Sequence, residues 1–307
     1  MDDEAARAAD RGLEWLAARQ AADGSWGDAR QPRNTAITSF VLLAFMARGH
    51  LPGQGKYGPE VARGARFLVA ASRPDGYLVG PSGGTMYCHG MATLALAELW
   101  GMTGDDAIRP VLIKAVDLIV RCQNPEGGWR YEPAPTGADI SVTIMQVMAL
   151  RAAKGAGLHV PDSTLARAIR YIKGRHHAPS GGFGYQDPAG PPGFARSAAG
   201  VCALQLAGAY DADEIPRAIT YLKENFNTRE HFWYGHYYAA HALHQVGGRE
   251  WDDWYARIRG LLLSKQGPAG DWPDESLDGQ PVGPVYQTSI AVIILATPGS
   301  LLPIYQS

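Results

Sequence analysis

A short turn that recurs along the chain constrains its fold more than any other feature. Three segments place a glutamine, a glycine-containing turn and a tryptophan six residues apart, namely Gln20 to Trp26, Gln123 to Trp129, and Gln266 to Trp272. Self-similarity at a long, fixed period indicates an architecture in which one supersecondary unit is repeated. The sequence is therefore expected to form a repeat protein.

Two further turns keep the glycine and replace the tryptophan, by Tyr77 and by Phe183. Successive aromatic residues from Trp26 to Phe183 lie 51, 52 and 54 residues apart. The interval from Phe183 to Trp272 is 89 residues, close to two periods, with a degenerate turn expected around residues 227–233. A period of this length accommodates two helices and their loops.

The stretches between the turns predict six pairs of helices. Outer helices, amphipathic with Arg and Lys on one face, are expected at 4–19, 58–72, 108–122, 162–176, 213–226 and 251–265. Inner helices, apolar nearly all round and rich in alanine, are expected at 34–48, 85–100, 139–155, 194–208, 231–246 and 285–296. The pattern predicts an all-α fold in one domain over residues 1–307. This is an (α/α)6 toroid with a central apolar cavity, because closing the ring buries the end units.

The turns themselves are expected to have a structural role. Glycine supplies the positive φ that ends an outer helix, and the aromatic residue packs between neighbouring pairs. The glutamine is expected to satisfy free backbone groups of the turn.

Composition excludes several classes of function. With 28 basic and 30 acidic residues the formal charge is −2, which offers no surface for nucleic acid and no polybasic membrane patch. No run approaches the roughly 18 to 20 apolar residues that span a bilayer, and the acidic N-terminus lacks a signal region, so a cytoplasmic location is expected. Peripheral membrane contact and a protein partner stay open. The three separated cysteines, Cys88, Cys122 and Cys202, are expected to be reduced thiols.

The first turns of the inner helices are expected to converge at one mouth of the cavity. The polar and aromatic candidates there are Asn34, Thr35, Tyr87, Cys88, His89, Asp139, Ser141, Thr143, Arg196, Trp233, Tyr234, His236, Tyr237, Tyr238, Tyr286 and Gln287. Such a rim above an apolar barrel is typical of a site for an apolar ligand with one polar anchor. The aromatic residues of segment 231–238 either hold an isoprenoid or a carbocation, or simply fill the core.

Segments 20–27, 123–129 and 181–184 resemble the repeats of the prenyltransferase and squalene-oxidase repeat superfamily, which includes triterpene cyclases and protein prenyltransferase β subunits. The resemblance covers essentially the whole chain. It is greatest to bacterial single-toroid proteins of squalene-cyclase-like type, which share stretches similar to 87–94 and 232–240. It implies a hydrophobic, isoprenoid-like ligand and no cofactor, although a shared fold does not fix the chemistry.

Asp139 is the candidate general acid that the resemblance implies. In class II terpene cyclases an Asp-x-Asp-Asp motif opens an inner helix, and its central aspartate protonates an alkene or epoxide. Asp139 occupies that position, whereas Gly137 and Ile140 replace the flanking carboxylates. Without a like-charged neighbour, a carboxyl at a helix N-terminus is expected to be ionised and to cap the helix. The roles of N-cap, acid, and ligand or metal contact stay open.

His236 is the second catalytic candidate. It resembles the histidine with which protein prenyltransferase β subunits complete a zinc site. Their Asp-x-Cys pair is absent from this sequence, so no metal is expected. Glycosidases of the (α/α) barrel type use paired carboxylates, and Asp139 could form such a pair with Glu132, Asp187, Asp274 or Glu275. The expected rim is, however, more aromatic and histidine-rich than acidic, so this class is the least favoured.

Two functions therefore stay open. The first is a terpene or squalene cyclase-like enzyme in which Asp139 is the acid and aromatic residues stabilise cations. The second is a non-catalytic toroid that binds a hydrophobic ligand or a protein partner through the same mouth.

Overall fold

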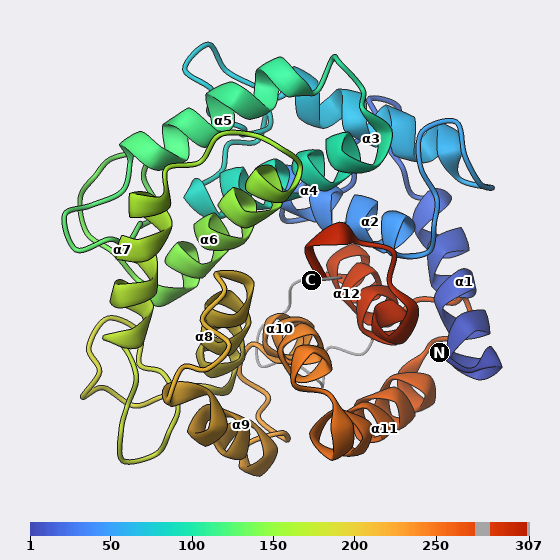
Figure 1. The fold of residues 1–307 in the computed structure, drawn as a ribbon. Helices are drawn as coiled ribbons and strands as arrows, with labels where there is room; N and C mark the ends of the chain where they lie inside the picture. Colours follow the sequence, from blue (N-terminus) through green and yellow to red (C-terminus); the bar gives the residue numbers. More distant parts are fainter. Residues whose placement is uncertain (274–282, 306–307) are drawn as a thin grey trace.

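The computed structural model describes residues 1–273 and 283–305, and within them twelve α-helices form two concentric rings (Figure 1). The outer helices are α1 (Asp3–Ala17), α3 (Gly58–Ala70), α5 (Arg109–Arg121), α7 (Asp162–Lys173), α9 (Glu214–Glu224) and α11 (Gly248–Lys265). The inner helices are α2 (Thr35–Ala47), α4 (Met86–Thr103), α6 (Ile140–Gly155), α8 (Phe194–Leu206), α10 (Phe232–Val246) and α12 (Pro284–Ala296). The predicted all-α toroid of six helix pairs is confirmed, with bounds that agree to within a few residues.

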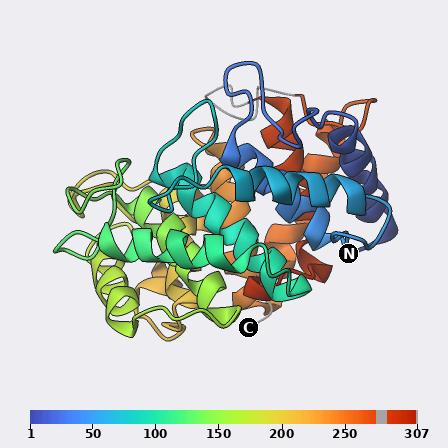
Figure 2. The same ribbon diagram turned by 90° about the horizontal axis from the view of Figure 1, so that it is seen from above.

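Burial separates the two rings as the sequence pattern predicts. Every residue of α2 is buried, whereas α1 buries one face and exposes the other. A helix that is apolar all round must be covered on all sides, and an amphipathic helix covers it from outside. Figure 2 shows the outer helices α3 and α5 lying across the inner ring. Among the described helices, none is long and apolar enough to cross a membrane.

Where the recurring turn carries a glutamine, it fastens its helix pair to the next outer helix. Gln123 Nε2 donates to the carbonyl of Gly127 in its own turn, at 2.9 Å, and to that of Thr164 in α7, also at 2.9 Å. Arg167 of α7 donates from Nε to Gln123 Oε1 at 2.9 Å. Trp129 completes the unit, because its indole Nε1 donates to Ile119 O in the preceding outer helix at 2.7 Å.

Gly127 is required by the close approach of this turn to the next outer helix. Its φ is 100°, and a Cβ built there would lie 2.4 Å from Arg167 O. Only glycine combines that backbone conformation with that contact at low cost. The same approach recurs in the other aromatic turns, at Gly24, Gly76, Gly181 and Gly270.

The last turn uses the same contacts to close the ring. Gln266 Nε2 donates to Gly270 O and to Ala8 O in α1, each at 2.8 Å, and Arg11 of α1 donates to the Gln266 carboxamide oxygen. Helix α1 thus makes with the last turn the contact that α7 makes with the Gln123 turn, and this closes the ring. Asp28, from the first turn, accepts from Val285 N at 3.2 Å and so caps α12.

Ile304 and Tyr305 fill the inside of the inner ring, on the side away from the N-termini of the inner helices. The Tyr305 hydroxyl lies 2.7 Å from that of Tyr237, and its ring stacks on His241 with 3.4 Å between centroids. Ile304 N donates to the Glu98 carboxyl at 3.2 Å, and burial raises the pKa of Glu98 to about 7. This packing leaves the open space of the ring at the other end, where the inner helices begin.

Replacement of Gln266 by alanine tests the closure contact. Gln266→Ala removes the partner of a carbonyl in α1 and of Arg11, so we expect the free energy of unfolding to fall by about 1–3 kcal/mol in urea denaturation. Gln245→Ala is the matched control, because neither polar atom of the Gln245 side chain has a hydrogen-bond partner among the described residues. Equal losses in the two variants would contradict the role given to Gln266.

Candidate functional site

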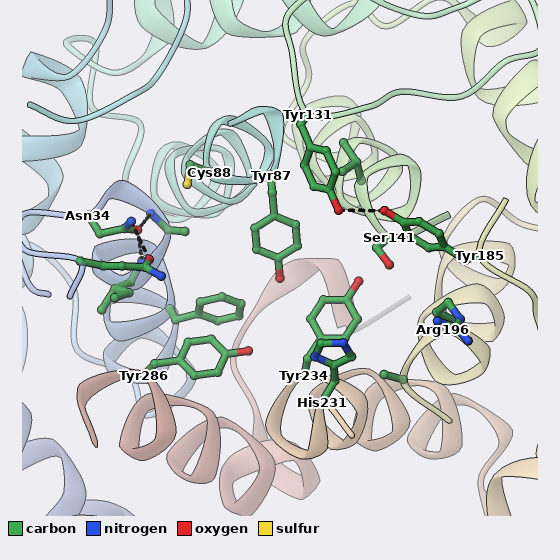
Figure 3. Close-up of a pocket in the computed structure, with 16 residues that line it drawn as sticks. Asn34, Tyr87, Cys88, Tyr131, Ser141, Tyr185, Arg196, His231, Tyr234 and Tyr286 are labelled. Carbon is green, nitrogen blue, oxygen red and sulfur yellow. Dashed lines mark hydrogen bonds between the residues drawn. The ribbon is translucent and has the colours of Figure 1, made fainter. Parts of the chain in front are cut away.

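A cavity of about 480 Å³ opens where the six inner helices begin, an end of the ring that we call the mouth. All six inner helices contribute a residue of their first turn or their cap. The described lining consists of Gln31, Asn34, Ala36, Ile37, Phe40, Tyr87, Cys88, Tyr131, Ser141, Val142, Tyr185, Ala195, Arg196, His231, Tyr234 and Tyr286 (Figure 3). The volume lies within the range of about 300–1,000 Å³ that is typical of small-molecule sites.

Aromatic rings form much of the wall. Phe40 packs edge-on against Tyr286 with 5.2 Å between ring centroids, and Tyr87 lies 6.0 Å from Tyr234. In Figure 3 the Tyr87 and Tyr286 hydroxyls point toward the middle of the cavity. Ile37 and Ala36 add aliphatic surface. Such a wall favours a ligand with an apolar body.

Three hydroxyl groups and a guanidinium gather on one side of the cavity. Ser141, Tyr185, Arg196 and Tyr234 lie together on that side in Figure 3. The Tyr185 hydroxyl lies 2.8 Å from the hydroxyl of Tyr131, which projects from the neighbouring turn. None of the described lining residues is an aspartate or a glutamate. The part of the cavity that the structure describes therefore has a polar edge without a carboxylate.

Asp139 lies just behind this polar edge and caps α6. One carboxyl oxygen accepts from Val142 N at 2.9 Å, which confirms the predicted N-cap. The residue is fully buried, and Oδ2 has no hydrogen-bond partner among the described residues. Burial raises the pKa of the carboxyl, against the opposing effects of the Val142 amide, Tyr185 and Arg130. The sequence showed the helix end, which favours the ionised form, but did not show this burial.

The structure places seven of the predicted site residues in the lining, namely Asn34, Tyr87, Cys88, Ser141, Arg196, Tyr234 and Tyr286. The others lie outside it, namely Thr35, His89, Asp139, Thr143, Trp233, His236, Tyr237, Tyr238 and Gln287. Tyr237 and Tyr238 belong to the next turn of α10, and the Tyr238 hydroxyl donates to Met145 Sδ at 3.6 Å. Trp233 is fully buried and packs edge-on against Phe232.

Thr143 and His89 fasten their inner helices to the preceding aromatic turns. Thr143 Oγ1 accepts from Trp129 N at 3.0 Å, and Thr38, Ser197 and Thr288 make the same contact in other units. His89 Nδ1 accepts from Leu78 N at 3.0 Å, which leaves Nε2 to donate to Ala115 O at 3.2 Å. Burial lowers the pKa of His89 to about 4, so the ring is neutral in this role.

His236 lies in the wall between the rings. Its Nε2 is 3.3 Å from Phe226 O, and its ring is surrounded by Phe194, Phe226, Phe232 and Trp254, with centroids 4.4 to 5.7 Å away. Burial lowers its pKa to about 3. Among the described residues, no group of three or more His, Cys, Asp or Glu side chains is arranged to hold a metal ion.

Sequence reasoning missed Tyr131 and Tyr185, which line the cavity from loops. Each follows its turn aromatic by two residues, and their carbonyls accept from the first amides of α4 and α6, Met86 N at 2.8 Å and Ile140 N at 3.2 Å. In these two turns the second residue after the aromatic therefore reaches the mouth. This fixed offset was the signal that could have identified them.

Comparisons with known proteins place these observations in context. No family model matches the chain. Over 197 residues it is 25% identical to a squalene–hopene cyclase of Bradyrhizobium diazoefficiens, a segment that covers 54% of this chain and 28% of that cyclase. Over 132 residues it is 33% identical to human lanosterol synthase, covering 40% of this chain and 18% of the synthase. The matched segments thus span less than a third of either relative.

Solved structures extend the comparison to the whole ring. The type II terpene cyclase MstE from Scytonema, in complex with geranylgeranyl dihydroxybenzoate, superimposes with a TM-score of 0.68 at 16% identity, over 96% of this chain and 98% of that one. The chain is a squalene-cyclase-like toroid. The GH76A α-1,6-mannanase of Salegentibacter has the same fold, with a TM-score of 0.74 at 11% identity and the same coverage of both chains. The squalene-cyclase-like fold therefore does not by itself decide the ligand.

Proposed function

We propose that the central cavity of this squalene-cyclase-like toroid binds an isoprenoid or an apolar chain of similar size. The observation that carries the proposal is the aromatic cavity of about 480 Å³ to which all six inner helices contribute. The similarity to squalene–hopene cyclase and the terpene cyclase solved with a geranylgeranyl ligand support the same ligand class.

The chemistry of the lining favours an isoprenoid over a sugar. Glycosidases use two carboxyl groups that flank the scissile bond. The described lining contains no carboxylate, and Asp139 lies behind it rather than in it. Of the four sequence candidates for a second carboxylate, Glu132 and Asp187 are not among the described lining residues, and Asp274 and Glu275 lie outside the described residues. Apolar contact with the rings of Phe40 and Tyr286 is the interaction that the described wall provides.

Occupation of the cavity can be tested by farnesol binding, measured by calorimetry. A tryptophan at position 141 would enter the cavity, so we expect Ser141→Trp to weaken binding at least about tenfold, the loss of roughly 1.4 kcal/mol of binding free energy. Ser264→Trp is the matched control, because Ser264 is exposed on the outer helix α11. No binding by the unaltered protein, or equal weakening by both substitutions, would refute the assignment.

Acid-initiated cyclisation is the second candidate function, and the burial of Asp139 favours it. A general acid for an alkene must be protonated, and burial shifts the Asp139 carboxyl in that direction. Asp139 is next in sequence to Ile140 and close to Ser141 and Val142, which line the cavity, so its carboxyl would lie directly behind the wall that contacts the ligand. The aromatic rings would then stabilise the cation that forms.

This second function is tested by incubating the protein with squalene, farnesyl diphosphate or geranylgeranyl diphosphate and identifying any product by mass spectrometry. Asn caps helices as well as Asp does, so Asp139→Asn is expected to keep the fold and to abolish cyclised product. In the unaltered protein, product formation should fall as the pH rises through the pKa of Asp139, above the ordinary value of 3.8, because the acid form is lost. A full yield from Asp139→Asn would eliminate Asp139 as the acid.

A further inference from the structure

Arg196 places a positive charge at the end of its helix that already carries partial positive charge. Arg196 is the third residue of α8, whose cap, Gly193, has no side chain to accept from the free amides. The first turn of α8 contains no acidic residue. The N-terminus of a helix carries partial positive charge, so a cation there is unfavourable unless an anion is also present. Departures of this kind from local rules concentrate at functional sites.

No carboxylate in the described part of the chain compensates this charge. Arg196 forms none of the ion pairs found among the described residues, whereas Arg63 pairs with Glu60 and Arg259 pairs with Asp2. One Arg196 nitrogen, Nη2, donates to Pro191 O at 3.0 Å, and the guanidinium lies 5.9 Å from the centre of the Tyr185 ring. Nε is buried and has no hydrogen-bond partner among the described residues.

The cavity presents donor groups around Arg196 and an aromatic surface on the opposite side. The hydroxyls of Ser141, Tyr185 and Tyr234 lie on the same side as the guanidinium (Figure 3) and are able to donate to an anion. The rings of Phe40 and Tyr286 lie on the other side, in edge-on contact with each other. The Asn34 carboxamide on that side already accepts from Ala36 N and Ile37 N and donates to Gln31 Oε1. The arrangement matches a molecule with an anionic head and an apolar chain.

We propose that the ligand of this cavity is an amphiphile whose single carboxylate pairs with Arg196 while its apolar chain lies against Phe40 and Tyr286. The proposal rests on the proposed function and names the head group of its ligand. The planar guanidinium binds a carboxylate through two parallel hydrogen bonds. Arg196 is the one arginine or lysine among the described lining residues. A diphosphate, with its greater charge, needs several cations or a magnesium ion held by carboxylates, and the described lining supplies neither.

Three probes with the same fifteen-carbon chain test the head group on the full-length protein, namely farnesoic acid, farnesol and farnesyl diphosphate. Calorimetry at one pH and one salt concentration gives the three dissociation constants. We expect the acid to bind about tenfold more tightly than the alcohol, as a charge-assisted pair in a partly buried site provides. Equal affinities for acid and alcohol, or tighter binding of the diphosphate than of the acid, would overturn the proposal.

Substitution of Arg196 supplies an independent test. Arg196→Gln is expected to reduce the affinity for farnesoic acid to that for farnesol and to leave farnesol binding unchanged. Arg196→Lys should retain part of the preference for the acid, and Arg66→Gln, an exposed position on α3, should change neither affinity. An equal fall in acid and alcohol binding in Arg196→Gln would show that Arg196 only shapes the cavity, and would refute the pairing.

The same data separate this inference from the function on which it rests. If none of the three probes binds, the proposed isoprenoid site fails and the inference fails with it. If farnesol binds and the acid has no advantage, the cavity assignment stands and only the carboxylate is refuted.

Discussion

The carboxamide of a glutamine, shared between its own turn and the next outer helix, is the contact on which the rest of the structure depends. In the middle of the chain Gln123 joins its turn to α7, and at the end Gln266 joins the last turn to α1. The same chemistry that stacks one unit on the next therefore also closes the ring. Closure brings six helix N-termini to one mouth, and the cavity exists because they meet there.

The fold could be predicted because its determinants repeat. The spacing from Gln123 to Trp129 and the burial pattern of helices such as α2 are properties of the local sequence, so periodicity identifies them. The site could be predicted only in part. Periodicity places Thr143 in a first turn, but it does not tell whether the side chain faces the cavity or the preceding turn. Tyr185 lies in a loop, where no helical period applies, and the burial of Asp139 depends on neighbours from other units.

The content of the cavity, rather than the fold, distinguishes the functions that this architecture supports. A terpene cyclase and a mannanase both superimpose on the chain along nearly its whole length. The cavity described here has an aromatic wall and a polar edge with Arg196, and its described lining has no carboxylate. Asp139 is a buried carboxyl behind that edge and outside the described lining.

A crystal structure of the protein with farnesoic acid bound at saturation tests the central claim most directly. We predict electron density for one molecule in the cavity, with its carboxylate on the guanidinium of Arg196 and its chain against Phe40 and Tyr286. Density for the ligand only on the outer helices, or an empty cavity at saturation, would contradict the account.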